Sequence, residues 1–281
     1  MMGAGQVRPV LYRAHRDGPT GGTVVLVHGS MDRARGFRRV AELLPDREVI
    51  GYDRRGWGSS RSLGTPAPDL PSHVDDLCAV LAGLPSPPVV AGHSYGGLVA
   101  LAAAARHPAL VRGLVVYEPP VRWLPWWPAD DPWAAAVKRA APDGPARVAQ
   151  AMAAALGPAG RLWLARRPPD QVAADGAALL AEMTDPSAGE PLFDPLALPV
   201  PTVTAAGSDS VPHHREVARR LADLLPHGRF RLIEGARHEA HVSHPGDFAG
   251  LVREAEDDGD DAGGAGERAL RDAGHAGTAH R

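Results

Sequence analysis

The residues with the clearest chemical pattern are Gly92-His93-Ser94-Tyr95-Gly96, which follow an apolar run and precede an Ala/Leu-rich one. This pattern predicts a very sharp turn from a strand into a helix, with the Ser94 hydroxyl projecting clear of the backbone. Glycine at 92 and 96 removes the side chains that such a turn would crowd. We therefore expect Ser94 to be a nucleophile, provided that a neighbouring base takes its proton.

The elements that must position this serine follow from the alternation of short Val/Ile/Leu runs with longer Ala/Leu-rich segments. That alternation is typical of βαβ units around a buried parallel sheet. Strands are predicted over Thr23–His28, Glu48–Asp53, Pro88–Gly92, Arg112–Glu118, Pro201–Gly207 and Arg229–Ile233, with a further edge strand within Val7–Ala14. Helices are predicted over Gly36–Leu44, Ser72–Leu84, Tyr95–Arg106, His213–Leu225 and Pro245–Glu256.

The serine turn and four further segments resemble motifs of the α/β-hydrolase family, and they occur in the same order along the chain as in that family. The resemblance runs from about residue 23 to 251. These segments are Val24–Ser30, which includes His28-Gly29, the D-x-R-G-x-G-x-S-like stretch Tyr52–Ser60, Pro201–Asp209 and Gly235–His238. The resemblance implies an α/β-hydrolase fold of the serine-nucleophile branch, with a mostly parallel twisted sheet flanked by helices. It also implies a helical cap inserted between two strands.

The same resemblance assigns roles to residues outside the serine turn. His238 occupies the place of the general base, and an imidazole with a near-neutral pKa suits that task. The backbone N–H groups of Ser30 and Tyr95 occupy the places of the oxyanion-hole donors. Met31 is expected to line the same pocket. Four further histidines are expected at the surface or in loops, namely His213, His214, His241 and His244.

Two carboxylates compete for the role of the acid that orients His238. Asp209 follows the strand that often carries this acid in the family, but it stands one position earlier than the G-x-x-D pattern places it. Glu118 ends the strand after the serine helix, where a buried carboxylate needs a partner such as a charged imidazole. Pairing of Glu118 with Arg122, and a turn or capping role for Asp209, are the non-catalytic alternatives. Glu118 is slightly favoured.

The chain is expected to divide into a core, a cap and a tail. Residues 1–118 and 200–255 form the predicted core, and the long insert 119–199 forms the predicted helical cap. The insert begins with tryptophans, of which Trp123, Trp126 and Trp127 are expected to bind substrate. Residues 256–281 are acidic and glycine-rich with little apolar surface, so this tail is predicted to be disordered.

Composition narrows the function classes. Thirty Lys and Arg against 33 Asp and Glu give a formal charge of −3, which favours neither a nucleic-acid partner nor a membrane. The single cysteine cannot form an intrachain disulfide, and Met1–Pro9 contains no apolar stretch of signal-peptide length. We expect a cytoplasmic monomer or homodimer that acts on a small molecule and needs neither cofactor nor metal.

These features predict a hydrolase that cleaves a small apolar ester, lactone or thioester through a Ser-His-acid triad and an acyl-enzyme. A C–C bond hydrolase, a cofactor-free perhydrolase or a lyase would use the same triad, because the cap and pocket walls decide among them. A ligand-binding relative with slow turnover is the alternative from another class. The intact serine, histidine and glycines favour the enzyme.

Overall fold

The computed structural model describes residues 11–14, 21–64 and 68–259, and the remaining part of the predicted edge strand, residues 7–10, lies outside them. Seven strands form one sheet in the order β1-β3-β2-β4-β5-β6-β7. All neighbouring pairs are parallel except β1 and β3. The strands are β1 Leu11–Ala14, β2 Thr23–Val27, β3 Glu48–Tyr52, β4 Val89–His93, β5 Gly113–Tyr117, β6 Thr202–Gly207 and β7 Gly228–Ile233.

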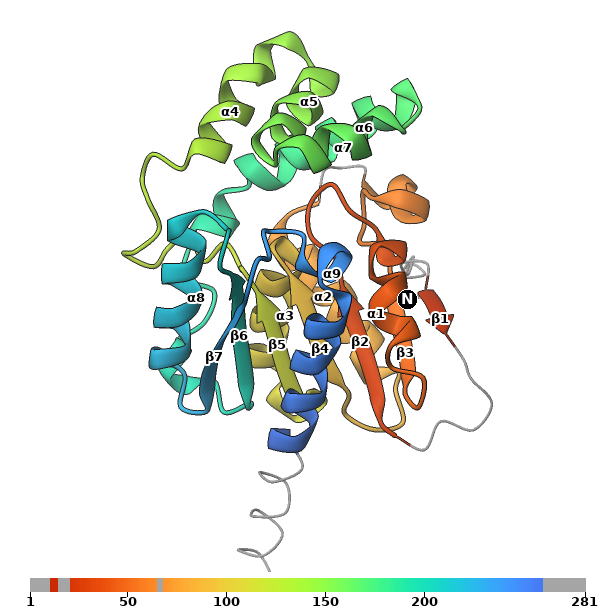
Figure 1. Cartoon of the computed structure of the whole chain (residues 1–281), viewed down its shortest axis with the longest axis vertical. Helices are drawn as coiled ribbons and strands as arrows, with labels where there is room; N and C mark the ends of the chain where they lie inside the picture. The colour runs from red at the N-terminus through yellow and green to blue at the C-terminus, as the bar shows by residue number, and fades with distance from the viewer. Residues whose placement is uncertain (1–10, 15–20, 65–67, 260–281) are drawn as a thin grey trace, which may run out of the picture.

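Helices cover both faces of the sheet, which explains why the central strands are apolar on both sides (Figure 1). Successive residues of each strand face opposite helical layers. Val25, for example, belongs to one buried apolar cluster and Val24 to the other. One layer contains α2 Leu70–Ala82, α3 Tyr95–Arg106 and α8 Pro212–Leu224. The other contains α1 Arg38–Glu42, α9 Ala240–Ser243 and a helix over 245–259.

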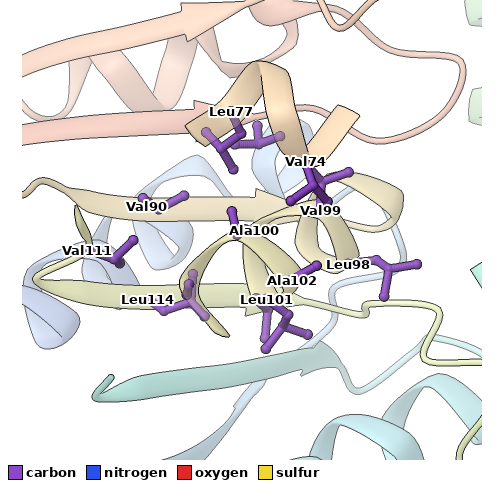
Figure 2. Close-up of a cluster of buried hydrophobic side chains, with 14 of the residues drawn as sticks. Val74, Leu77, Val90, Leu98, Val99, Ala100, Leu101, Ala102, Val111 and Leu114 are labelled. Carbon is purple, nitrogen blue, oxygen red and sulfur yellow. The ribbon is translucent and has the colours of Figure 1, made fainter. Parts of the chain in front are cut away.

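The core between the sheet and its first helical layer is built from small and branched aliphatic side chains. Figure 2 shows Leu77 of α2 and Leu101 of α3 packed over Val90 and Leu114 of the sheet. All four of these side chains are completely buried. Such a close-packed layer holds the start of α3, and therefore the serine turn, in a fixed place.

The helices between β5 and β6, called the cap below, lie above the end of the sheet in Figure 1, where the sequence predicts the insert. These helices are α4 Pro132–Ala140, α5 Pro145–Ala155, α6 Pro158–Ala165 and α7 Pro169–Thr184. They share a small apolar core of their own, which Met31 and Trp57 join from loops of the main domain. The flanks of the predicted insert 119–199 differ from its middle, because Val121 and Leu198 pack into the main core.

The predicted start of a disordered tail at residue 256 is wrong, because the last helix continues to residue 259. Glu256 is buried, and its carboxylate accepts hydrogen bonds from Arg47 at 2.8 Å and from Arg112 at 3.1 Å. The sequence prediction counted apolar surface alone and missed these ion pairs, whose partners lie far away in the chain. Residues 260–281 lie outside the described residues.

None of the helices in the described part of the chain combines the length and the apolar composition that a membrane crossing requires.

Candidate active site

Ser94 lies on the sharp turn that the sequence predicts, between β4 and α3. Its backbone adopts φ 53° and ψ −125°, a strained conformation for a residue with a side chain. A Cβ on Gly92 would lie 2.5 Å from the Gly96 carbonyl oxygen, and a Cβ on Gly96 would lie 2.3 Å from that of Val27. Both glycines are therefore required for the turn. The Ser94 side chain opens on a cavity between the sheet and the cap.

The predicted oxyanion donors lie on either side of this turn. Tyr95 is the first residue of α3, where the N–H groups have no partner within the helix. Within the described residues, the N–H groups of Ser30 and Tyr95 donate to no protein acceptor. The loop after β2 can approach the serine turn this closely only with glycine at position 29, because a Cβ there would lie 2.9 Å from the Cβ of Ser94. Free N–H groups beside a serine are suited to an oxyanion.

Glu118, and not Asp209, is the carboxylate that reaches His238. The Glu118 Oε2 atom accepts hydrogen bonds from Nδ1 of His238 at 2.6 Å and from Nδ1 of His214 at 2.9 Å. Its Oε1 atom accepts the N–H of Gly207 at 2.9 Å. Glu118 itself has a positive φ of 49°, which turns its side chain back over the end of β6. The arrangement leaves Nε2 of His238 as the ring atom available to a substrate or to Ser94.

Asp209 lies apart from this cluster. Its side chain is exposed, and its only side-chain hydrogen bond in the described residues comes from Ser208, at 3.4 Å. The backbone N–H of Asp209 donates to the carbonyl of Ala236, so the turn after β6 is closed without the carboxylate. Arg122, the suggested non-catalytic partner of Glu118, donates instead to the sulfur of Met183.

The expectation that His214 and His241 lie at the surface is wrong, because both are buried. His214 stands in the first turn of α8 and points at Glu118. The Nε2 atom of His241 lies 3.0 Å from Asp32, and its ring stacks 4.4 Å from that of His93. His93 in turn lies beneath the site and donates from Nε2 to the His238 carbonyl at 2.8 Å. No local sequence signal marks the two buried histidines.

In the cluster of Glu118, His214 and His238, the surroundings of Glu118 keep its carboxylate ionised. Burial alone favours the neutral form of Glu118, but the hydrogen bonds from His214 and His238 hold its pKa well below the ordinary range. Burial lowers the pKa of His214 from 6.5 to about 4, so this imidazole is neutral at pH 7. A neutral His214 can donate one proton to Glu118 while adding no charge that would compete with an imidazolium at His238.

The cavity over Ser94 is small, about 50 Å³, and is walled mainly by apolar side chains. Trp127 is one of the lining residues, and its predicted binding of substrate stays a prediction. Trp123 packs against Phe193, and Trp126 lies under the Arg220 guanidinium, so the structure places neither in the lining. Met31 is likewise absent from the lining and is buried in the cap core. The lining comprises Ser30, Ser94, Tyr95, Glu118, Pro120, Arg122, Trp127, Asp131, Trp133, Met152, Leu156, Leu179, Met183, His214 and His238.

Glu182 on α7 is a buried carboxylate of the cap that hydrogen-bonds to three residues of the main domain. Its Oε1 atom accepts from Nη1 of Arg54 at 2.6 Å and from the indole of Trp57 at 2.7 Å. Its Oε2 atom accepts the hydroxyl of Ser30 at 2.5 Å. Arg54 and Glu182 are both almost fully buried. The cap is therefore tied to the loop that carries one of the predicted oxyanion donors.

Replacing Glu182 with methionine is expected to lower the free energy of unfolding by about 3 to 5 kcal/mol. The change leaves the Arg54 charge buried without a counterion, and an unpaired buried charge strongly destabilises the folded state. Urea unfolding followed by circular dichroism measures the loss. Glu190→Gln, an exposed change in the same insert, serves as the control, and the double variant Arg54→Met/Glu182→Met should regain much of the stability. A loss below about 1 kcal/mol would show that the pair is not desolvated.

Acidification from pH 6.5 to about 4 is expected to reduce the free energy of unfolding. Burial lowers the pKa of His214 to about 4, and burial together with Arg54 lowers that of His28 to about 3. Between these values and 6.5 the unfolded chain binds protons that the folded chain does not, so acid favours unfolding. Above pH 6.5 both states are neutral and the effect vanishes. One pKa unit corresponds to about 1.4 kcal/mol, so His214 contributes a loss of about 3 kcal/mol.

Urea unfolding at about pH 7, 5.5 and 4.5 tests this slope. His214→Gln keeps a donor toward Glu118 and removes the titrating ring, so its stability should fall less steeply with acid than that of the wild type. His107→Gln changes an exposed histidine and should leave the slope as it is. Equal slopes for the wild type and His214→Gln would contradict the assignment.

Two clusters of one carboxylate and two histidines have the composition of a metal site. They are Glu118 with His214 and His238, and Asp32 with His93 and His241, and their candidate ligand atoms lie within 4.8 Å of one another. In each cluster an imidazole already hydrogen-bonds to the carboxylate. The absence of a metal requirement stays a prediction.

The sheet order, the strained serine turn and the helical insert define an α/β protein of the hydrolase type. A profile described as the alpha/beta hydrolase family matches residues 24–251. The chain therefore belongs to the α/β-hydrolase family, and the fold predicted from the sequence is confirmed.

Several known proteins are similar to the chain. Lipase LipV of Mycobacterium tuberculosis is 37% identical over 108 residues, which are 38% of this chain and 41% of that protein. A monoacylglycerol lipase of Mycolicibacterium smegmatis is 32% identical over 127 residues, 42% and 45% of the two chains. These matches span less than half of either relative. The structure of a thermophilic esterase from Thermogutta terrifontis aligns with a TM-score of 0.62 at 25% identity, over 87% of this chain and 92% of that one.

Proposed function

We propose that the chain is a serine hydrolase that cleaves a carboxylic ester, lactone or thioester with a short apolar acyl group. The observation that carries this proposal is the hydrogen bond from His238 to the ionised Glu118, at the sheet edge that also presents Ser94 on its strained turn. The similar proteins named as lipases and an esterase add support, because those names denote hydrolysis of the same chemical class of bond.

Each member of the triad has a separate task in the proposed mechanism. His238 removes the proton of Ser94 through Nε2 as the hydroxyl attacks the acyl carbon, and later returns it to the leaving alcohol or thiol. Glu118 holds the ring in the tautomer with a proton on Nδ1 and stabilises the imidazolium. The N–H groups of Ser30 and Tyr95 stabilise the tetrahedral oxyanion, with a loss of about 3 kcal/mol expected for one missing donor. Water attacks the acyl-enzyme in the second half-reaction.

The walls of the cavity support a short apolar acyl group. Its lining combines Trp127, Trp133, Met152, Leu156 and Leu179, and its volume of about 50 Å³ is far below the roughly 300–1,000 Å³ of drug-sized ligand pockets. The ring of Trp133 meets that of His238 edge-on at 4.8 Å between centroids, so the cap contributes directly to the wall beside the base.

Turnover of p-nitrophenyl esters of increasing acyl length tests the proposed function. We expect kcat/KM to be highest for short chains, with turnover continuing for many cycles and unchanged by EDTA. A single burst without turnover would favour a ligand-binding relative. Hydrolysis of a diketone, or perhydrolysis of acetate with peroxide, at higher kcat/KM than any ester would contradict the ester assignment.

A further inference from the structure

Two buried hydrogen-bond donors, on residues that line the cavity, have no acceptor within the described part of the chain. The Nε atom of Arg122 and the hydroxyl of Tyr95 are each buried and make no hydrogen bond within the described residues. Both residues line the cavity that contains Ser94. Buried donors without partners are uncommon in folded proteins and need an explanation.

The guanidinium of Arg122 is also without a counterion. Its Nη2 atom donates to the sulfur of Met183 at 2.8 Å, and a thioether is only a weak acceptor. No carboxylate among the described residues forms an ion pair with it. Arg122 is half-buried, and the part of its guanidinium that is shielded from water gains from an anionic partner.

The carboxylates around the cavity are already committed to other donors. Glu118 accepts from two imidazoles, and Glu182 accepts from Arg54, Trp57 and Ser30. Asp131, the remaining acid of the lining, caps α4 through the Trp133 N–H at 2.9 Å, and its charge acts on His213. Asp131 is therefore not the missing counterion of Arg122.

Tyr95 is available as a second donor to the same anion. Burial raises the pKa of its hydroxyl well above the ordinary value, so the proton stays in place at working pH. The charges of Glu182, Arg54, Asp185 and Arg122 all act on this hydroxyl. Glu182 is paired with Arg54, and Asp185 accepts the N–H of Leu70, so Arg122 is the cation of this group that has no ion-pair partner among the described residues. A guanidinium and a hydroxyl on two residues that line the same cavity offer the charge-assisted hydrogen bonds that a carboxylate accepts.

We propose that Arg122 and the Tyr95 hydroxyl form a carboxylate-binding site at the cavity, so that the preferred substrates are short esters whose apolar acyl chain ends in a second, ionised carboxyl group. This inference rests on the proposed function for its reaction and narrows its substrate: the apolar walls hold the methylene chain, and the two donors hold the charged end. It also assigns the Tyr95 side chain a task separate from that of its backbone N–H.

Matched pairs of substrates test the charge preference. The pairs are monomethyl malonate with methyl propanoate, monomethyl succinate with methyl butanoate, and monomethyl glutarate with methyl pentanoate. For the pair of best-fitting length, we expect the acidic ester to have at least about a ten-fold higher kcat/KM, a factor that equals 1.4 kcal/mol. Turnover of the neutral esters reports the proposed function on its own.

Variants connect the preference to the two donors. Arg122→Met should reduce the ratio of acidic to neutral kcat/KM to about one, Tyr95→Phe should reduce it partly, and Arg122→Lys should retain part of it. Arg139→Met removes an exposed cap arginine on α4 and should leave the ratio unchanged. An unchanged ratio in Arg122→Met, or a wild type that prefers the neutral esters, would overturn the inference.

Binding is measured separately in the Ser94→Ala protein, by NMR titration with the same pairs. This protein should bind the acidic ester more tightly than its neutral partner, and the added Arg122→Met change should abolish the difference. Because no turnover is needed, the result stands even if the proposed hydrolysis fails. Equal affinities in the Ser94→Ala protein would overturn the inference.

Discussion

Replacing Ser94 with alanine is expected to lower kcat by about 10⁵- to 10⁶-fold, because the attacking atom of the proposed mechanism is then missing. The Oγ atom is the only part of the turn that changes. Ser94→Ala should therefore keep the fold and the small cavity, with KM changed by less than about three-fold where activity is measurable.

The comparison is made with the best p-nitrophenyl ester of the acyl series, and thermal unfolding confirms that the variant is folded. Ser59→Ala, a change in another loop of the main domain, serves as the matched control and should retain activity. Turnover within ten-fold of the wild type in a folded Ser94→Ala protein would exclude a covalent role for this residue.

Replacing Glu118 with glutamine is expected to lower kcat/KM by about 10⁴-fold. Glutamine has nearly the same shape, but it cannot stabilise an imidazolium at His238, and its amide N–H₂ can force the ring into the wrong tautomer. The same change at Asp209, Asp209→Asn, should alter kcat/KM by less than about two-fold, since that side chain is exposed and makes no hydrogen bond to His238 among the described residues.

The variant Glu118→Asp separates a catalytic role of Glu118 from a structural one. Aspartate keeps the negative charge but is one methylene group shorter, so the kcat/KM of Glu118→Asp should lie between those of the wild type and Glu118→Gln. Thermal unfolding checks that both variants are folded. A folded Glu118→Gln protein with wild-type activity, or a larger loss in Asp209→Asn, would return the role of the acid to Asp209.

Most of the fold was predictable because its signals are local. The apolar runs predict six strands within one or two residues of their observed ends, and the helix Tyr95–Arg106 has the bounds that the sequence predicts. The serine turn could be predicted from the sequence because it requires glycine at positions 92 and 96. A Cβ at either position would overlap backbone atoms. Steric requirements of this kind act over a few residues.

The polar contacts of the site were predictable only in part, because they join distant parts of the chain. Glu182 is 128 residues from Arg54, and nothing in its Ala-rich helix distinguishes it from a solvated glutamate. His214 is 96 residues from Glu118 and lies in an otherwise charged, amphipathic helix. The choice between Glu118 and Asp209 depended on the positive φ of Glu118, which no sequence pattern indicated.

Intact-mass analysis after exposure to a small fluorophosphonate tests whether Ser94 is an activated nucleophile. The wild type should gain the mass of one adduct, Ser94→Ala should gain none, and Glu118→Gln should react far more slowly than Asp209→Asn. A folded wild type that stays unmodified, or a Ser94→Ala protein that is still labelled, would contradict the account.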